Sequence, residues 1–251
     1  AANGTFSINV NPADLRGLAD GTLATSVTLL TPDGNTSTTT GPSIKVGLTN
    51  LPTVAITSLF GGDGYLSQAE AGVAQTISGV SNLANGTVTL RIGTETLTGT
   101  ITNGIWSVSV PSATLKGLTD GGVNVSVSVR DDVGNVGTGS QLVNAIINAV
   151  PQVTLATPFG DGNLSLSDLL SPQILSGTTS NLAAGTALTI TLGGLTFNTT
   201  VAADGTWRLP LPTATLQSLQ DGALTVGVTA KDVAGNVASA TQNLAVAIQQ
   251  V

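Results

Sequence analysis

The feature that most constrains the fold of this chain is an internal repeat of about 100 residues. A turn followed by a large aromatic residue begins at positions 3, 103 and 204 and ends on Phe6, Trp106 and Trp207. Each copy is followed by an L-x-x-L-x-D-G motif, which ends at Gly21, Gly121 and Gly222. Self-similarity at a fixed period indicates tandem copies of one structural module.

The runs after each motif alternate strictly between apolar and polar residues. The clearest run has valine at every second position from Val123 to Val129, with polar residues between them. A period of two indicates a strand with one buried face and one solvated face. Each full copy holds about seven such short runs, separated by Gly, Asn and Asp turns, which is typical of an immunoglobulin-type sandwich. The predicted fold class is therefore all-β, with tandem immunoglobulin-like antiparallel β-sandwich domains.

The repeat predicts how the chain divides into domains. The front half of the module occurs only twice, starting at Pro52 and at Pro151, so residues 52–150 and 151–251 are expected to be complete domains. Residues 1–51 are expected to hold only the last three strands, which begin at Phe6, around Leu23 to Leu29 and around Ile44 to Leu48. We expect their missing half either upstream in the natural protein or on another chain, because three strands leave one apolar face uncovered. Val150 leads directly into Pro151, and such a short junction predicts a stiff rod.

Trp106 and Trp207 each begin an alternating series of apolar residues, namely Val108 and Val110 after the first and Leu209 and Leu211 after the second. This pattern predicts that both indoles point into the core of a sandwich. The alternative role for an aromatic side chain, stacking on a sugar, requires it to lie exposed on the surface.

Composition excludes several classes of function. The 251 residues include no Cys, Met or His, so thiol nucleophiles, histidine bases and disulfides are absent. The net charge is −7 and the seven basic residues are scattered singly, which argues against nucleic acid as a partner. No apolar run approaches the ~20 residues that span a bilayer. An enzyme is therefore not expected.

Eleven of the fourteen acidic residues fall in three recurrent loops. Strand direction in a sandwich places two of these loops at the pole nearest the next domain and the last hairpin at the opposite pole. Carboxylate and Asn oxygens are typical Ca²⁺ ligands, so Ca²⁺ at the domain junctions would offset the repulsion between the carboxylates. The candidate ligands of the three loops are Asp63, Glu70, Asp161 and Asp168 in the first, Asp20, Asp120 and Asp221 in the second, and Asp131, Asp132, Asn135, Asp232 and Asn236 in the last hairpin.

Turn chemistry is the alternative explanation of the same residues. Asp-Gly and Gly-Asn pairs are ordinary turn sequences. Ser67-x-x-Glu70 and Ser165-x-x-Asp168 are spaced to cap short helical turns. Both explanations stay open at the level of the sequence.

The Asp-x-x-Gly-Asn hairpin (Asp131 to Asn135, Asp232 to Asn236) and the Gly-Asp-Gly-x-Leu-Ser loop that begins at Gly62 resemble those of bacterial immunoglobulin-like repeats in giant secreted adhesins. That loop recurs with one change from Gly160. The resemblance implies many further repeats, a secreted location at the cell surface or in the biofilm matrix, and stiffening by Ca²⁺. The first copy departs from it, because Thr31 stands in place of the hairpin Asp.

Three classes of function are compatible with a tandem of sandwiches. A structural stalk of an adhesin, with neighbouring repeats, other copies or cell-surface and matrix components as partners, needs few exposed aromatic residues. A carbohydrate-binding module needs an aromatic platform, and the chain has only seven aromatic residues. A fibre or surface-layer subunit completed by a strand from another chain is the third class, and the incomplete residues 1–51 favour it.

Overall fold

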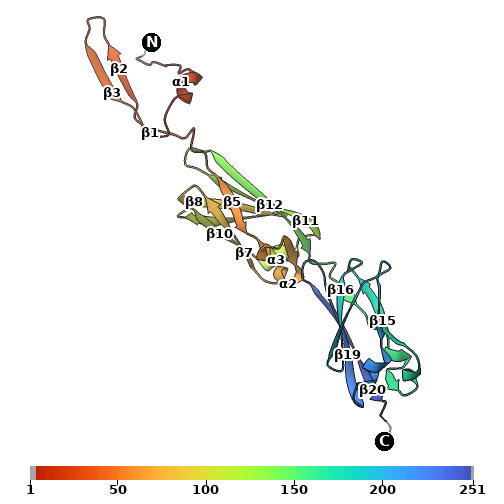
Figure 1. The fold of residues 1–251 in the computed structure, drawn as a ribbon. Helices are drawn as coiled ribbons and strands as arrows, with labels where there is room; N and C mark the ends of the chain where they lie inside the picture. Colours follow the sequence, from red (N-terminus) through yellow and green to blue (C-terminus); the bar gives the residue numbers. More distant parts are fainter. Residues whose placement is uncertain (1–3, 250–251) are drawn as a thin grey trace. The chain divides into compact units, whose positions relative to one another are not determined.

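The computed structural model describes residues 4–249 and confirms the all-β, sandwich-like organisation. The helices are single turns between strands (Figure 1). By internal packing the chain forms two compact units. Unit 1 is the chain up to Leu59 with Thr76–Ser109 and Asn124–Gln141, and unit 2 is Phe60–Gln75, Val110–Val123 and the chain from Leu142 onward.

Residues 52–150, here the middle segment, form one sheet of eight strands in the order β5-β7-β10-β9-β8-β11-β12-β6. The elements are β5 (Val54–Ser58), η1 (Phe60–Gly62), β6 (Tyr65–Ser67), α2 (Gln68–Ala71), β7 (Gln75–Ser81), β8 (Asn85–Ile92), β9 (Glu95–Thr102), β10 (Ile105–Val110), α3 (Ser112–Lys116), β11 (Gly121–Arg130) and β12 (Val136–Ile146).

Residues 151–249, here the C-terminal segment, lie in unit 2 and repeat this strand order in two separate sheets. A sheet of three strands has the order β13-β15-β18, and a sheet of five has the order β14-β20-β19-β16-β17. The elements are β13 (Gln152–Val153), η2 (Pro158–Gly160), β14 (Asn163–Ser165), η3 (Asp168–Leu170), β15 (Gln173–Ser180), β16 (Ala187–Leu192), β17 (Leu195–Thr200), β18 (Thr206–Leu211), α4 (Thr213–Gln217), β19 (Gly222–Lys231) and β20 (Val237–Ala247).

Each of these segments has eight strands instead of the seven expected, because the first loop contains one more short strand. The additional strand, β6 or β14, pairs in parallel with the last strand of its own segment. Its final pairs are Ser67 with Ile146 in the middle segment and Ser165 with Ala247 in the C-terminal one. The first loop of each segment is thereby fixed at the same end of the sandwich as the end of the last strand.

Both tryptophans are buried, as predicted, with 1% of each side chain exposed. Trp106 donates its Nε1–H to the Val80 carbonyl at 3.2 Å, and Trp207 donates to the Thr154 carbonyl at 3.0 Å, so neither indole N–H is left unsatisfied. The alternating residues that follow them are buried as well, and Val110 is fully inaccessible.

Gly79 in β7 and Gly177 in β15 lie at positions where a side chain would not fit. A Cβ atom on Gly79 would overlap the Ala55 carbonyl oxygen and the Trp106 ring. A Cβ atom on Gly177 would overlap the Thr154 carbonyl oxygen and the Trp207 indole in the same way. Glycine is therefore required where the indole lies flat across the strand.

The N-terminal segment (residues 4–51) differs from the other two. It contains α1 (Pro12–Arg16), the β1–β4 pair (Gly21–Leu23 with Ile44–Val46) and the β2–β3 pair (Ser26–Leu30 with Thr36–Thr40). None of its described residues is buried, and Phe6 and Ile8 are 68% and 74% exposed. The expected strand at Phe6 is wrong for the described structure, because the front-half strands that would flank it are not part of the N-terminal segment.

The core assignment predicts that Trp207→Ala lowers the free energy of unfolding of the C-terminal segment by about 3–5 kcal/mol, through lost burial and a residual cavity. Leu170→Ala is the matched control, because that side chain is 88% exposed and its truncation is expected to change stability by less than about 0.5 kcal/mol. Urea unfolding followed by circular dichroism measures both variants. Wild-type stability of the Trp207 variant would contradict the assignment.

Candidate functional site

The Asp of the L-x-x-L-x-D-G motif binds the backbone just after the last strand. In the N-terminal segment, Asp20 accepts hydrogen bonds from the backbone N–H groups of Leu48 at 2.6 Å and Asn50 at 2.7 Å. Thr49 adds its backbone N–H at 3.1 Å and its hydroxyl at 2.7 Å. A carboxylate therefore satisfies several donors that would otherwise lack partners where the strand ends.

The same arrangement recurs at equivalent positions of the other two segments. Asp120 accepts from the N–H groups of Ile147 at 2.9 Å and Ala149 at 2.7 Å. Asp221 accepts from Ile248 at 2.8 Å and Gln249 at 3.2 Å. The motif is thus a structural clamp on the segment end, which explains why Asp recurs there at fixed spacing.

These bonds stabilise the charged form of the carboxyl groups. The backbone N–H groups of Leu48 and Asn50 hold the pKa of Asp20 well below its usual range. At Asp120, desolvation on its own raises the pKa, but the hydrogen bonds from Ala149, Ile147 and Asn148 outweigh it and the net pKa is lowered. The hydrogen bonds therefore favour the ionised form of Asp20 and Asp120.

The last hairpin holds a second recurrent carboxylate. Asp131 accepts from the N–H of Asn135 at 2.8 Å and from its side-chain Nδ2 at 2.8 Å, and Asp232 makes the equivalent bonds to Asn236 at 2.9 and 2.8 Å. At Asp131, desolvation raises the pKa, but the side-chain and backbone bonds from Asn135 reverse the effect and lower it. The Asp side chain thus fixes both the hairpin and the orientation of the Asn amide.

Within unit 2, Asn236 of this hairpin contacts the end of the β6–β12 pair. Its Oδ1 accepts from the Gln68 backbone N–H at 2.8 Å, and its Nδ2 donates to the Ile146 carbonyl at 2.8 Å. These two backbone groups directly follow the last residue pair of the parallel ladder, Ser67 with Ile146. The amide therefore continues the ladder across the boundary between the middle and C-terminal segments, and only 8% of Asn236 is exposed.

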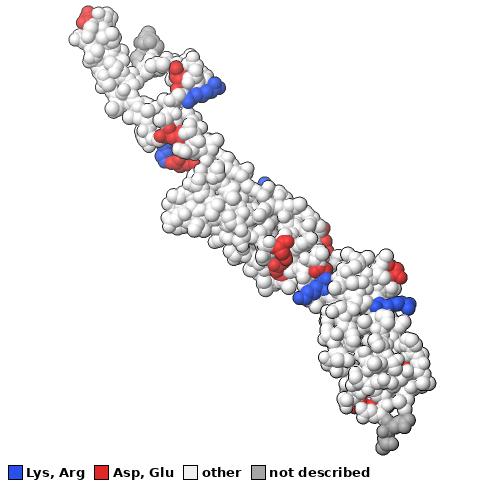
Figure 2. All heavy atoms as spheres, viewed as in Figure 1, with Lys and Arg blue, Asp and Glu red and all other residues white. Residues whose placement is uncertain are grey.

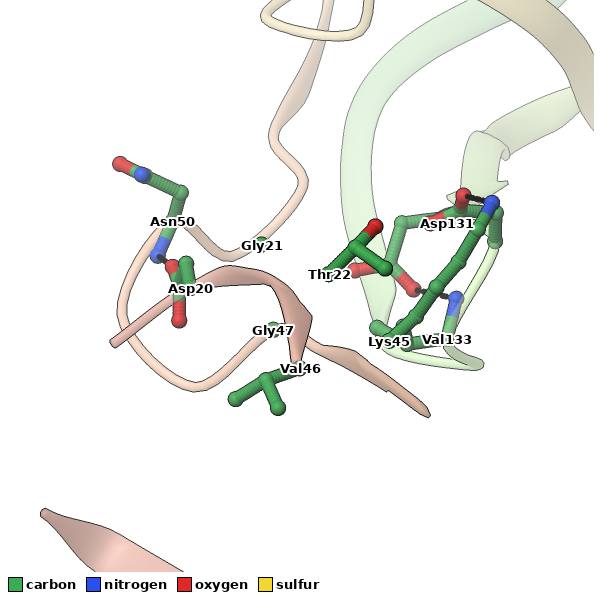
Figure 3. A pocket seen from close by; sticks show the side chains of 10 residues that line it. Asp20, Gly21, Thr22, Lys45, Val46, Gly47, Asn50, Asp131 and Val133 are labelled. Carbon is green, nitrogen blue, oxygen red and sulfur yellow. Dashed lines mark hydrogen bonds and ion pairs between the residues drawn. The ribbon is translucent and has the colours of Figure 1, made fainter. Parts of the chain in front are cut away.

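Within unit 1, Asn135 makes an equivalent contact with the N-terminal segment by donating Nδ2 to the Gly47 carbonyl at 2.8 Å. Lys45 and Asp132 form an ion pair beside it, and both lie with Asp20 around a surface hollow (Figure 3). The ion pair is exposed, so its contribution to stability is small. Gly47 and Lys45 were not predicted from the sequence. Gly47 contributes its backbone carbonyl, and a Cβ atom at this position would lie 2.7 Å from a methyl carbon of Val133.

The acidic residues of the first loop serve local turns. Glu70 forms a capping box with Ser67, as the sequence alternative predicted. Asp168 accepts from the Ser165 hydroxyl and backbone N–H at 2.6 and 2.8 Å, and the hydroxyl bond is the main reason that its pKa is lowered. Asp63 and Asp161 each accept from the N–H two residues further on, at 2.9 and 2.8 Å, to Tyr65 and Asn163 respectively.

The expected Ca²⁺ ligands fit a calcium ion by donor chemistry, since they are carboxylate and amide oxygens. Their geometry is less favourable. Within residues 4–249, no three acidic side chains lie close enough together to hold a metal ion. Both side-chain polar atoms of Asn236 and both oxygens of Asp232 are already used in hydrogen bonds. In the view of Figure 2 most of the surface is uncharged, and the acidic side chains form a few separate groups, some with basic side chains beside them.

The fold and the recurrent ends define a class, namely tandem immunoglobulin-like sandwich repeats with hydrogen-bonded ends. Residues 172–249 match the family model described as bacterial Ig-like domain. This part of the chain is therefore a bacterial immunoglobulin-like domain, and the resemblance predicted from the hairpin and loop motifs is confirmed. No helix within residues 4–249 is long and apolar enough to cross a membrane.

Several solved structures are similar to the chain. A chain of a 1.5-MDa bacterial ice-binding adhesin is 28% identical, with 80% of this chain and 65% of that chain covered and a TM-score of 0.45. A Ca²⁺-stabilised, ice-binding adhesin of an Antarctic bacterium is 30% identical, with 100% and 62% covered and a TM-score of 0.45. An immunoglobulin-like domain of the M. primoryensis ice-binding adhesin is 27% identical, with 40% and 99% covered and a TM-score of 0.31.

The chain thus spans 65% and 62% of the length of the first two of these structures. No curated protein matches it significantly.

The clamp predicts a pH dependence that Asp120→Asn abolishes. A carboxyl group with a lowered folded-state pKa contributes stability above its usual value of 3.8 and loses it as the pH falls through the folded value. We expect Asp120→Asn to destabilise the middle segment by about 1 kcal/mol at pH 7, after allowance for solvent screening. The difference from wild type should shrink steadily below about pH 4.

Thermal unfolding at a series of pH values measures this effect. Asp33→Asn, an equal charge change at the tip of the β2–β3 hairpin, is the control and should leave the stability of the middle segment at pH 7 unchanged. An Asp120→Asn deficit that stays constant down to pH 2 would contradict the clamp.

Proposed function

We propose that the chain is a run of structural stalk repeats from a large bacterial surface adhesin, divided as residues 1–51, 52–150 and 151–251. Residues 172–249 being a bacterial Ig-like domain and the recurrence of its motifs along the whole sequence support this division. The step from repeat module to adhesin is supported by the hairpin and loop motifs that resemble those of adhesin repeats. In this role the repeats project a binding region away from the cell and support adhesion and biofilm formation.

The observation that carries the proposal is the Asn236 joint. A side chain from one repeat completes the backbone ladder of the preceding repeat through two hydrogen bonds of 2.8 Å. Only five residues, 147–151, connect β12, which ends at Ile146, to β13, which begins at Gln152. Asp120 binds the backbone N–H groups of the first three of them. A short linker and a hydrogen-bonded joint both restrict hinge motion, which is the property that a stalk requires.

No enzymatic activity is proposed for this segment. The sequence has no His or Cys to activate its many Ser and Thr hydroxyl groups. The recurrent Asp side chains at the segment ends accept backbone N–H groups, a structural use of their charge. Carbohydrate binding is disfavoured because Trp106 and Trp207, the largest aromatic side chains, are buried.

The proposed location is the cell surface or the biofilm matrix after secretion, and the proposed partners are neighbouring repeats. A fibre or surface-layer subunit is the second candidate. The exposed apolar residues of the N-terminal segment favour it, because Phe6 and Ile8 would become core residues if a further layer of strands covered them. Front-half strands, from upstream sequence or from another chain, would provide that layer.

Calcium at the segment ends is also part of the proposal. Among the candidate ligands of the second junction, the carboxylate oxygens with no hydrogen bond found within residues 4–249 are Oδ2 of Asp63 and Oε1 of Glu70, which lies beside Gly61. They are the most available ligands at the second junction, where Asp120, whose two oxygens accept backbone N–H groups, is a further candidate. Asp20, Asp131, Asp132 and Asn135 form the corresponding group at the first junction, Asp232 and Asn236 join the second, and Asp161, Asp168 and Asp221 form the group at the far end of the C-terminal segment.

The calcium proposal predicts that chelation loosens the array more than it unfolds the domains. At a free Ca²⁺ concentration of ten times Kd, binding adds about 1.4 kcal/mol per site. We expect EDTA to broaden the pair-distance distribution in small-angle scattering and to lower the melting temperature by a few degrees. Asp63→Asn keeps the acceptor for the Tyr65 N–H but removes the charge, so it should weaken both responses, whereas Asp14→Asn in α1 should not.

The outcomes separate the two parts of the proposal. If EDTA changes neither the scattering nor the melting temperature, calcium has no structural role here, and the stalk proposal stands on the Asn236 joint alone. If scattering shows freely jointed domains both with and without calcium, the stalk proposal fails.

A further inference from the structure

The C-terminal segment ends in the same pair of backbone groups that Asn236 binds in the middle segment. Its parallel ladder finishes with Ser165 opposite Ala247, as that of the middle segment finishes with Ser67 opposite Ile146. The equivalents of the Gln68 N–H and the Ile146 carbonyl are therefore the Leu166 N–H and the Ala247 carbonyl. Leu166 and Ala247 are both exposed, and the hydrogen bonds found within residues 4–249 include none from the Leu166 N–H.

The surroundings of the two ladder ends are also alike. Asp120 binds the N–H groups that follow Ile146, and Asp221 binds those that follow Ala247. Ser67 donates its backbone N–H to Glu70, and Ser165 donates its backbone N–H to Asp168, so a carboxylate three residues further on orders the first loop in both segments. The element that follows differs, because α2 begins at Gln68 whereas η3 begins at Asp168. The receiving end is thus preformed in the C-terminal segment.

A primary amide is the side-chain group that suits such a ladder end. It offers one acceptor and two donors in a plane, so it bonds to an N–H and to a carbonyl at once, as a peptide group does. In Asn236 the second donor is held by Asp232 at 2.8 Å, which fixes the orientation of the amide. An Asp side chain in place of the Asn would lack the donor for the carbonyl, and an Ala would lack both bonds.

We propose that the ladder end formed by the Leu166 N–H and the Ala247 carbonyl is a docking site for the Asn side chain of an Asp-x-x-Gly-Asn hairpin on another bacterial Ig-like repeat. This inference rests on the proposed function, in which such repeats stack end to end. It names the specificity-determining contact, which is the Asn amide held by its hairpin Asp.

A second copy of this chain is a poor occupant of the site. Its Asn135 and Asn236 amides are already bonded to Gly47 and Ile146. In its remaining hairpin, between β2 and β3, Thr31 stands in place of the Asp. The Thr31 hydroxyl accepts a hydrogen bond from the Asn35 backbone N–H at 3.2 Å. No carboxylate orients the Asn35 amide, so the hairpin of a following repeat is the expected occupant.

The test extends the whole chain by a second copy of residues 151–251, with Val251 joined to Pro as Val150 is joined to Pro151. Backbone amide exchange is followed by NMR. We expect the Leu166 N–H to exchange about tenfold more slowly in the extended chain than in the 251-residue chain. Asn236→Ala or Asn236→Leu in the appended copy alone should remove this protection, because neither side chain offers an acceptor for the Leu166 N–H. Val233→Ala in the appended copy, at an exposed position of the same hairpin, should leave it intact.

The Gln68 N–H of the unextended chain is the internal reference, since Asn236→Ala should expose it to the same degree. Fast Leu166 exchange in the extended chain, with Gln68 protected as expected, would overturn the docking site but leave the proposed function standing. Protection of Leu166 that survives both Asn236 substitutions would also overturn it. A Gln68 N–H that does not respond to Asn236→Ala would remove the joint on which the proposed function rests.

Discussion

Backbone N–H and C=O groups that lose their partners where strands end are the constraint on which the ends of these segments depend. Inside a sandwich the ladder satisfies such groups, and at the ends nothing does so automatically. This chain satisfies them with short side chains at fixed spacing. Asp120 accepts the N–H groups after the last strand, and Asn236 bonds to the N–H and carbonyl at the end of the parallel pair.

This arrangement accounts for the concentration of acidic residues in the end loops. Few residues of the chain are charged, and most of the acidic ones lie in the end loops. A carboxylate that accepts two or three N–H groups forms stronger bonds than a neutral acceptor, and Asp20 and Asp120 have lowered pKa values for this reason. The same residues are the natural candidates for calcium ligands. The hydrogen bonds therefore order the end loops, and a bound calcium ion would stiffen these loops further.

Much of the fold could be predicted from the sequence because burial imposes a period. The alternation from Val123 to Val129 and the position of Trp207 depend only on which face of a strand meets the core. The β6 and β14 strands could not be predicted in this way, since they are three residues long and are defined by parallel pairing to a distant strand. The strand expected at Phe6 does not form, because a strand needs neighbours that the N-terminal segment lacks.

The candidate site was predictable in part for a related reason. The Asp and Asn residues of the end loops could be identified by their recurrence, because their side chains form the hydrogen bonds at the segment ends. Their partners at Gln68 and Ile146 act through the backbone, so the sequence gives no signal for them. The Asn236 amide thus emerged as a joint between repeats only when its two backbone partners were placed.

The most direct test of this joint is ¹⁵N relaxation of the whole chain, with Asn236 compared with Asn236→Asp, which keeps the shape and removes the donor to the Ile146 carbonyl. With the joint intact, amides of the middle and C-terminal segments should share one rotational correlation time. In the variant the two segments should tumble with distinct, shorter correlation times while their sandwiches stay folded. Identical relaxation in the wild type and the variant would contradict a joint made by this amide.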